Sequence, residues 1–151
     1  MDFALRPLRE SDRTSWQQLY RAYLHFYETE PVLEATELVW KRLSSLTPEI
    51  HSVVAEFDGQ LAGIAHFHFQ VSTWEQSSVC YLEDLYVDER FRGRGLATAL
   101  IREVQRTATE QGCEELYWIT RASNSTARSV YEKLAEESDF IRYEMRLGDS
   151  L

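Results

Sequence analysis

The sequence lacks most features that mark specialised classes of protein. Its only cysteines are Cys80 and Cys113, too few for a disulfide framework or a cysteine-ligated metal site and typical of a reducing cytoplasm. No apolar run is long enough to span a bilayer, and the first residues lack the charged and apolar regions of a signal peptide. Repeats and low-complexity stretches are also missing. These absences predict a cytoplasmic protein without a membrane partner, formed by one domain at residues 1–151.

Positive charge is scarce as well. The chain carries a formal net charge of −9, which argues against a nucleic-acid partner because the phosphate backbone requires a basic surface. The same charge suits a cationic substrate, although ordinary solubility accounts for it equally well. Residues 90–106 reverse the trend, with five arginines against one glutamate. An acidic protein with one basic turn suggests two ligands, an anionic cofactor at the turn and a cation elsewhere.

What is present is a succession of strand and helix patterns, with a hydrophobic fraction of 44% that is typical of a globular protein. Asp58-Gly59 stands between two apolar runs and predicts a hairpin. Helices are expected after a cap at Ser11 or Asp12, at about 35–46, from Leu96 to an end at Gly112, and after a cap at Ser123 or Asn124. Strands are expected at 3–6, 52–57, 61–69, 79–87, 116–120 and 140–145. This order predicts an α/β domain with a mixed sheet.

The run from Asp88 to Ala97 is the most informative stretch. It follows the apolar strand at 79–87 and opens a helix, so backbone N–H groups without helical partners and the positive end of the helix dipole favour a phosphate group there. Gly93 and Gly95 allow the main chain to approach the ligand closely. A nucleotide P-loop is excluded because the required Gly-Lys-Ser/Thr is absent. The alternative is a plain turn with surface arginines.

Arg90-Phe91-Arg92-Gly93-Arg94-Gly95 resembles the acetyl-CoA signature of the GCN5-related N-acetyltransferase (GNAT) family, which reads Arg or Gln, two residues, Gly, one residue, Gly or Ala. The strand ending in Leu85-Tyr86-Val87 and the arrival of Asn124 and Tyr131 one strand later extend the resemblance. It looks closest to the polyamine and diamine acetyltransferases and the yeast histone and polyamine acetyltransferase branch, although Lys133-Leu134-Ala135 stands where many relatives have Gly-Phe after the tyrosine.

The resemblance implies a fold and a donor substrate. The fold is a mixed, mostly antiparallel central sheet flanked by about four helices and splayed between the strands at 79–87 and about 115–120. Backbone amides from Gly93 through Thr98 receive the pyrophosphate of acetyl-CoA, and no metal is needed. Asn124 reaches the pantetheine arm, caps a helix, or does both. The full expected set of cofactor contacts is Leu85, Tyr86, Val87, Arg90, Arg92, Gly93, Arg94, Gly95, Leu96, Ala97, Thr98, Asn124 and Tyr131.

Two residues are expected to carry the chemistry. Tyr131 is the candidate general acid, because a phenol with an ordinary pKa of about 10 keeps a proton to donate to the leaving thiolate; the alternative is a core aromatic. A carboxylate at 83 or 84 is expected to accept the proton of the amine, directly or through water. The polyamine-type relatives that the chain resembles favour the first of the pair, here Glu83; the alternative is that Glu83 only binds a cation or faces solvent. Strand alternation puts Glu83 and Asp84 on opposite faces, which leaves Asp84 a structural hydrogen bond.

Aromatic and histidine side chains complete the candidate features. Tyr20, Tyr23, Phe26 and Tyr27, with Glu28 and Glu30, either wall a cleft for a cationic amine or form core. His66 and His68 share one strand face, but two histidines without a third ligand make a poor zinc site.

The sequence therefore predicts an acetyl-CoA-dependent N-acetyltransferase that transfers directly, in a ternary complex, to a small cationic amine such as a polyamine or diamine. A protein lysine, an amino acid or an aminoglycoside is the alternative acceptor. A non-catalytic acyl-CoA sensor is the alternative of a different class. The resemblance also implies a homodimer.

Overall fold

The computed structural model describes residues 3–148. The chain divides between Ile119 and Thr120 into two units, and each is described by itself. A single domain over residues 1–151 stays a prediction. Within the described residues, no helix has both the length and the apolar character needed to cross a membrane.

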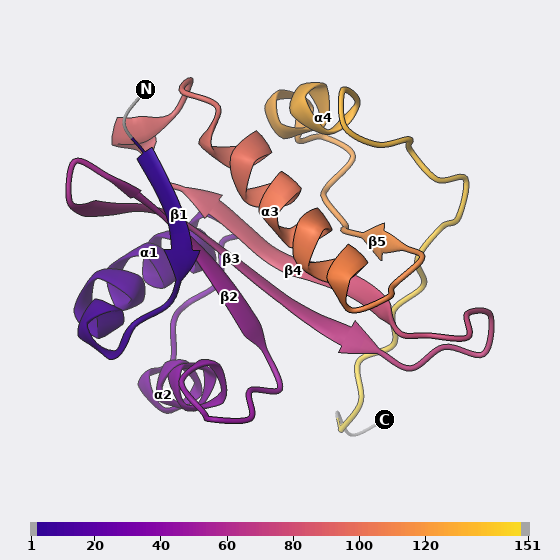
Figure 1. The fold of residues 1–151 in the computed structure, drawn as a ribbon, viewed down its shortest axis with the longest axis horizontal. Helices are drawn as coiled ribbons and strands as arrows, with labels where there is room; N and C mark the ends of the chain where they lie inside the picture. Colours follow the sequence, from indigo (N-terminus) through magenta and orange to yellow (C-terminus); the bar gives the residue numbers. More distant parts are fainter. Residues whose placement is uncertain (1–2, 149–151) are drawn as a thin grey trace. The chain divides into compact units, whose positions relative to one another are not determined.

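The first unit contains a five-stranded sheet in the order β1-β2-β3-β4-β5 (Figure 1). The first four strands pair antiparallel with their neighbours, and β5 pairs with β4 in parallel. The strands are β1 (Phe3–Pro7), β2 (His51–Phe57), β3 (Gln60–Gln70), β4 (Val79–Val87) and β5 (Leu116–Tyr117). This confirms the predicted mixed, mostly antiparallel sheet.

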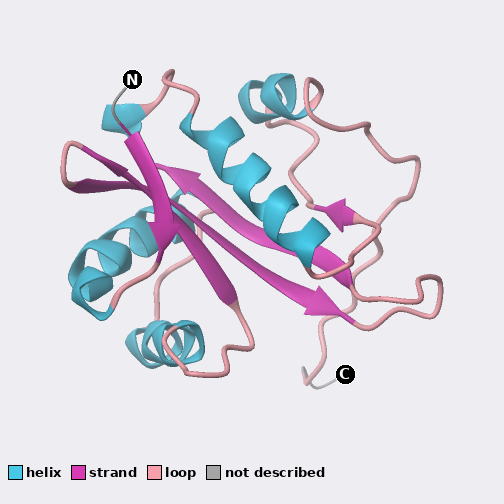
Figure 2. Ribbon diagram, in the orientation of Figure 1, coloured by secondary structure: helices cyan, strands magenta, loops and turns pink. Residues whose placement is uncertain are grey.

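Helices cover both faces of this sheet. On one face, α1 (Arg13–Phe26) and α2 (Leu33–Leu43) supply Trp16 and Trp40 to a core that also contains Val54 of β2. On the other face, α3 (Leu96–Glu110) lies across the strands, as Figure 2 shows. Its buried residues recur at helical spacing, as predicted: Leu96, Leu100, Ile101, Val104 and Ala108.

Gly63 of β3 marks the closest approach between α3 and the sheet. A Cβ atom built there would lie 3.1 Å from Cδ1 of Leu100 and 3.2 Å from the carbonyl oxygen of Tyr86. The absence of a side chain at this position therefore lets the helix rest directly on the strands.

The second unit contains α4 (Ser125–Tyr131), which begins after Asn124 as predicted. The expected final strand at 140–145 is wrong, because the described part of this segment forms no strand. Ile141 is 78% exposed and Tyr143 is 91% exposed. The alternating pattern there is strand-like, but a strand requires a partner strand to bond with.

The remaining boundaries differ modestly from expectation. The second helix begins and ends two to three residues earlier than the predicted 35–46, at Leu33 and Leu43. The strand expected at 116–120 keeps only Leu116 and Tyr117. The Asp58-Gly59 hairpin is confirmed, with both residues at positive φ (50° and 76°) between β2 and β3.

Candidate active site

The link between β4 and α3 has the geometry of an anion-binding turn. A short 3-10 helix, η2 (Glu89–Phe91), follows β4, and Gly93 and Gly95 then adopt φ angles of 77° and 82°. A Cβ atom built on either glycine would meet no atom within 4 Å, so the space beside the main chain is open. The first hydrogen bond of α3 runs from the Ala99 N–H to the Gly95 carbonyl at 3.0 Å. The N–H groups of residues 96–98 come before it in the chain and therefore have no carbonyl partner within the helix. These donors, at the positive end of the helix dipole, fit a pyrophosphate.

The arginines of this turn are held by contacts within the protein. Arg90 pairs with Asp88 (Nη2 to Oδ2, 2.8 Å). Nε of Arg92 donates to the Val87 carbonyl at 3.0 Å. The guanidinium of Arg94 lies 4.8 Å from the centroid of an aromatic ring on β2. The three positive charges therefore stay close to the turn, with positions fixed by the chain itself.

Among residues 3–148, one edge of β4 has no strand partner over most of its length. β5 pairs only with Cys80 and Tyr81, so β4 from Leu82 onwards is splayed from β5, as predicted. The Asp88 N–H donates to the Ala62 carbonyl at 2.8 Å. Main-chain groups alternate between the two edges of an antiparallel strand, so those of Leu85 and Val87 point to the open edge and those of Tyr86 point to β3. Leu85 and Val87 therefore suit the amide groups of an extended ligand.

A β-bulge in β4 creates the second part of the candidate site. His66 of β3 pairs with Asp84, the next residue of β3 pairs with Leu82, and Glu83 is the extra residue between them. Nδ1 of His66 lies 2.8 Å from Oδ2 of Asp84, and Nε2 of His68 lies 2.9 Å from Oε1 of Glu83. Both carboxylates therefore contact histidines of one strand face. The expectation that Glu83 and Asp84 lie on opposite faces is wrong, because strict alternation fails where a bulge inserts a residue.

Glu83, Asp84, His66 and His68 are called the paired-carboxylate cluster below. Its two pairs differ in solvent exposure: the side chains of His66 and Asp84 are 1% and 13% exposed, whereas those of His68 and Glu83 are 24% and 45% exposed. The Asp84 carboxylate is thus mostly enclosed by protein but keeps a small exposed part, whereas the Glu83 carboxylate is largely open to solvent.

Aromatic side chains of α1 pack beside the paired-carboxylate cluster. The Tyr20 ring centroid lies 5.7 Å from that of His66, and the Tyr23 hydroxyl donates to the Glu83 carbonyl at 3.5 Å. Burial, and after it the negative charge of Asp84, raises the pKa of Tyr20 to about 12 and also raises the pKa of Tyr23. Both phenols are therefore neutral aromatic walls near two carboxylates, a combination that suits a cation.

The other members of the predicted aromatic wall are less well placed. Phe26 is 51% exposed, and Tyr27 packs against Tyr23 with ring centroids 5.1 Å apart. Glu28 and Glu30 follow α1 and are exposed. The prediction of a wall therefore holds for the middle of α1 better than for its end.

The second unit holds the two remaining predicted residues. Asn124 occupies the N-cap position of α4, but its side chain donates to Oγ1 of Thr120 at 3.2 Å and does not cap the helix. Tyr131 is the last residue of α4 and is half-buried, and its carbonyl accepts hydrogen bonds from two amides of the following turn at 2.9 Å.

Sequence reasoning missed the partners of the acidic residues. The sequence indicates only a poor zinc site for His66 and His68 and no particular role for Trp16. The available indication was a pair of histidines two residues apart on one strand, with an acidic pair on the strand that follows it in the chain. It could not be interpreted without the register of β3 on β4.

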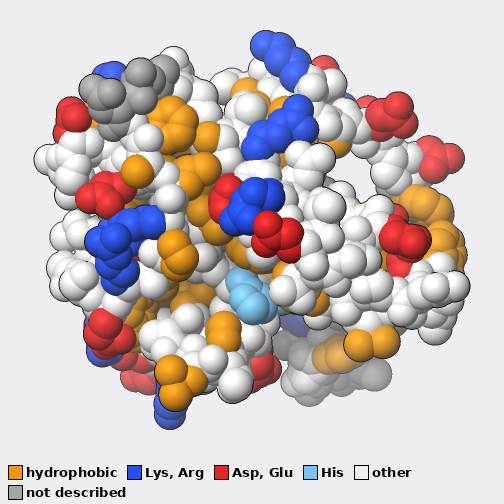
Figure 3. All heavy atoms as spheres, in the orientation of Figure 1, with side chains coloured by type: hydrophobic (Ala, Val, Ile, Leu, Met, Phe, Trp, Pro, Cys, Tyr) orange, Lys and Arg blue, Asp and Glu red, His pale blue; other side chains and the backbone are white. Residues whose placement is uncertain are grey.

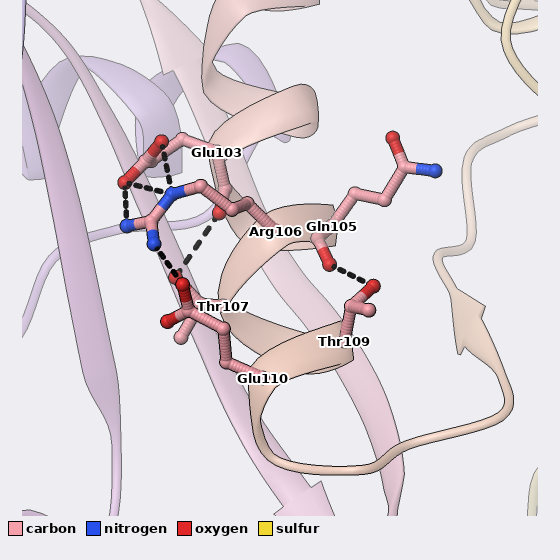
Figure 4. Close-up of polar contacts among 6 residues, drawn as sticks. All are labelled: Glu103, Gln105, Arg106, Thr107, Thr109 and Glu110. Atoms are coloured by element: carbon pink, nitrogen blue, oxygen red, sulfur yellow. Dashed lines mark hydrogen bonds and ion pairs between the residues drawn. The ribbon is translucent and has the colours of Figure 1, made fainter.

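Charged side chains of both signs occur near α3. Figure 3 shows Lys and Arg side chains interspersed with Asp and Glu on the face that α3 covers. On the outer side of α3, Arg106 bonds with Glu103 and Glu110 (Figure 4).

Comparison with known proteins agrees with this geometry. A sequence profile described as the Acetyltransferase (GNAT) family matches residues 14–135. The chain is 30% identical over 142 residues to the D-amino-acid N-acetyltransferase HPA3 of Saccharomyces cerevisiae, covering 92% of this chain and 88% of the relative. It is 28% identical over 142 residues to the thialysine N-epsilon-acetyltransferase of Mus musculus, covering 88% and 83%. The solved structure of AAC(6')-Iy with a bisubstrate analogue of CoA and acetylneamine superimposes with a TM-score of 0.75 at 26% identity, covering 97% of this chain and 99% of that one.

Proposed function

The chain belongs to the GNAT family of N-acetyltransferases, and from this membership we propose that it transfers an acetyl group from acetyl-CoA to a primary amine of a small cationic molecule. The observation that carries the choice of acceptor is the paired-carboxylate cluster beside the neutral phenols of Tyr20 and Tyr23. The same strand leads from this cluster directly into the anion-binding turn. Similar proteins are named for amino acids, thialysine and aminoglycosides, all of which carry amines.

The donor substrate is held by main-chain groups. The N–H groups of residues 96–98 bind the pyrophosphate, and the fixed charges of Arg90, Arg92 and Arg94 favour its approach. Leu85 and Val87 bind the pantetheine amides along the open edge of β4. When bound, acetyl-CoA supplies an acetyl thioester, which an uncharged amine can attack.

Glu83 prepares the amine for attack. An alkylamine is protonated at neutral pH and must lose a proton before its nitrogen can act as a nucleophile. The Glu83 carboxylate is 45% exposed and held by His68, so it can take this proton directly or through water. We propose it as the general base.

Direct transfer is favoured by the state of the cysteines. Cys80 is fully buried, and burial, followed by the proximity of Cys113, raises the pKa of its thiol to about 12. Burial also raises the pKa of Cys113. A thiol that rarely ionises is a poor nucleophile, so an acetylated cysteine intermediate is disfavoured and a ternary complex is the better proposal.

Tyr131 is proposed as the general acid that donates its phenolic proton to the departing sulfur, supported by its position in the family pattern. The test is thiol release from acetyl-CoA with a panel of polyamines, amino acids, lysine peptides and aminoglycosides. We expect turnover with one amine class and a fall of about a hundredfold in kcat for Tyr131→Phe. Tight acetyl-CoA binding without turnover on any amine would instead support a sensor.

A second copy of the chain is the proposed protein partner. Ile141, Tyr143, Met145 and Leu147 are between 78% and 91% exposed and spaced in a strand-like pattern. Such a segment is suited to pairing with another chain. Light scattering tests this: a dimer is expected, and Ile141→Arg with Tyr143→Asp should give a monomer.

A cytoplasmic location is also proposed, supported by the two free thiols at Cys80 and Cys113. Fractionation of the source cells tests it.

A further inference from the structure

A chain of three hydrogen-bonded side chains leads from α1 to the paired-carboxylate cluster. The Trp16 indole Nε1–H donates to Nε2 of His66 at 2.9 Å, and Nδ1 of His66 lies 2.8 Å from Oδ2 of Asp84. Trp16 and His66 are each only 1% exposed, so water does not compete for these bonds. The three residues come from three different elements and fix the orientation of Asp84.

Trp16 determines which nitrogen of His66 carries the proton. An indole N–H donates and never accepts, so Nε2 must present its lone pair and the imidazole proton must lie on Nδ1. The Nδ1–H then donates to Asp84, which acts as an acceptor. A second proton on His66 would direct an N–H against the indole N–H. The bond from Trp16 therefore selects the tautomer in which Nδ1 of His66 carries the proton.

The exposed pair of the cluster is arranged differently. His68 contacts Glu83 through Nε2, and its ring meets Tyr81 edge-on at 5.4 Å. Glu83 is more than three times as exposed as Asp84. The two adjacent carboxylates are thus held differently: Asp84 is oriented by a buried histidine, whereas Glu83 is open to water and to a ligand.

We infer that Asp84 is the fixed anion that binds the ammonium group of the acceptor amine, and that His66, in the tautomer set by Trp16, is a positioning residue for Asp84. This inference rests on the proposed function and adds two residues to it. Asp84 orients the amine nitrogen, while Glu83 accepts its proton. The other titratable groups that face Asp84 are Tyr20 and Tyr23 from α1, and Glu83 and His68 from the strands.

The kinetic test uses His66→Leu, His66→Asn and Trp16→Phe with the best acceptor from the panel. Leucine removes the donor to Asp84, and we expect the acceptor KM to rise about tenfold or more, with the acetyl-CoA KM much less affected. Asparagine restores an N–H near the position of Nδ1 and should recover most of the loss. Phe67→Leu is the matched control, because Phe67 is equally buried on the next position of β3 but lies on the opposite sheet face.

Trp16→Phe should change the pH dependence of the acceptor KM, which a loss of packing alone would not do. Without the indole donor, Nε2 of His66 can take a proton, which would offset the charge of Asp84. We expect the acceptor KM of this variant to rise more than that of the wild type as pH falls from about 7.5 to about 5.5.

A second readout requires no turnover. Nitrogen NMR of imidazole-labelled wild-type protein should show His66 protonated on Nδ1 and unprotonated on Nε2 throughout that pH range. A His66 that titrates, or a His66→Leu enzyme with the wild-type acceptor KM, overturns the inference and leaves the proposed function intact. Failure of the wild type to acetylate any amine overturns the proposed function, and the inference with it.

Discussion

The two parts of β4 that bear on function are built in different ways. At the end of the strand, the anion-binding turn is a local structure: glycines at positive φ, a new helix and its first N–H groups lie within a few residues of one another. In the middle of the strand, the paired-carboxylate cluster depends on β3 and α1 as well as on β4. The first is specified by consecutive residues, and the second by the register between strands. This difference indicates that donor binding depends less than acceptor binding on the register between strands.

The strongest test of the acceptor side is Glu83→Gln. Glutamine can still bond with His68 but cannot take a proton, so we expect kcat/KM for the amine to fall about a hundredfold. Glu49→Gln, at an exposed site before β2, makes the same change of charge and should leave the kinetics unaltered. If kcat is retained and only the acceptor KM rises, Glu83 binds the cation and is not the base.

On the donor side, Gly95→Val should weaken acetyl-CoA binding about tenfold, measured by calorimetry. The φ of 82° is strained for a β-branched residue, so the first turn of α3 must move. Gly112→Val introduces similar strain (φ 83°) at the other end of the helix and should lower the melting temperature without this loss of affinity. Equal losses in both variants would contradict a local binding turn.

Removing one arginine of the anion-binding turn should have a smaller effect on acetyl-CoA affinity. Arg92→Ala should weaken acetyl-CoA binding about threefold, and the difference should shrink as salt is added, because the charge acts over a screened distance. Arg106→Ala, on the outer side of α3 (Figure 4), is the matched loss of a positive charge and should leave the affinity unchanged. A salt-independent loss for Arg92→Ala would show that its bond to the Val87 carbonyl matters more than its charge.

The mildest test follows the ionisation of Tyr20. Its pKa is raised to about 12, first by burial and then by Asp84 and Glu83. Negative charges disfavour a phenolate, so replacing both carboxylates with amides should lower this pKa while leaving it above the ordinary value of about 10. Carbon NMR of labelled tyrosine follows the titration. An unchanged pKa would place the carboxylates too far away to form a common site with Tyr20.

Local features such as the anion-binding turn could be predicted from the sequence, whereas features that depend on strand register, such as the paired-carboxylate cluster, could not. The turn, the hairpin and the stripe of α3 were predicted correctly, because each depends on neighbours in the chain or on a single helical period. The bulge at Glu83 was not predicted, since an extra residue in a strand is visible only against its partner strand. The strand at 140–145 was predicted wrongly for a related reason: alternation marks the capacity to pair, and the described residues supply no partner there.

The contact at Gly63 bears on how this protein can vary through evolution. With Leu100 and the Tyr86 carbonyl both within 3.2 Å of a hypothetical methyl group, a side chain at residue 63 would force the Leu100 side chain or the neighbouring strand to shift. The start of α3 forms the anion-binding turn, and Tyr86 belongs to the strand that carries the paired-carboxylate cluster. Selection for binding either substrate therefore also acts on a position that contacts neither, and drift at residue 63 is restricted by two functions at once.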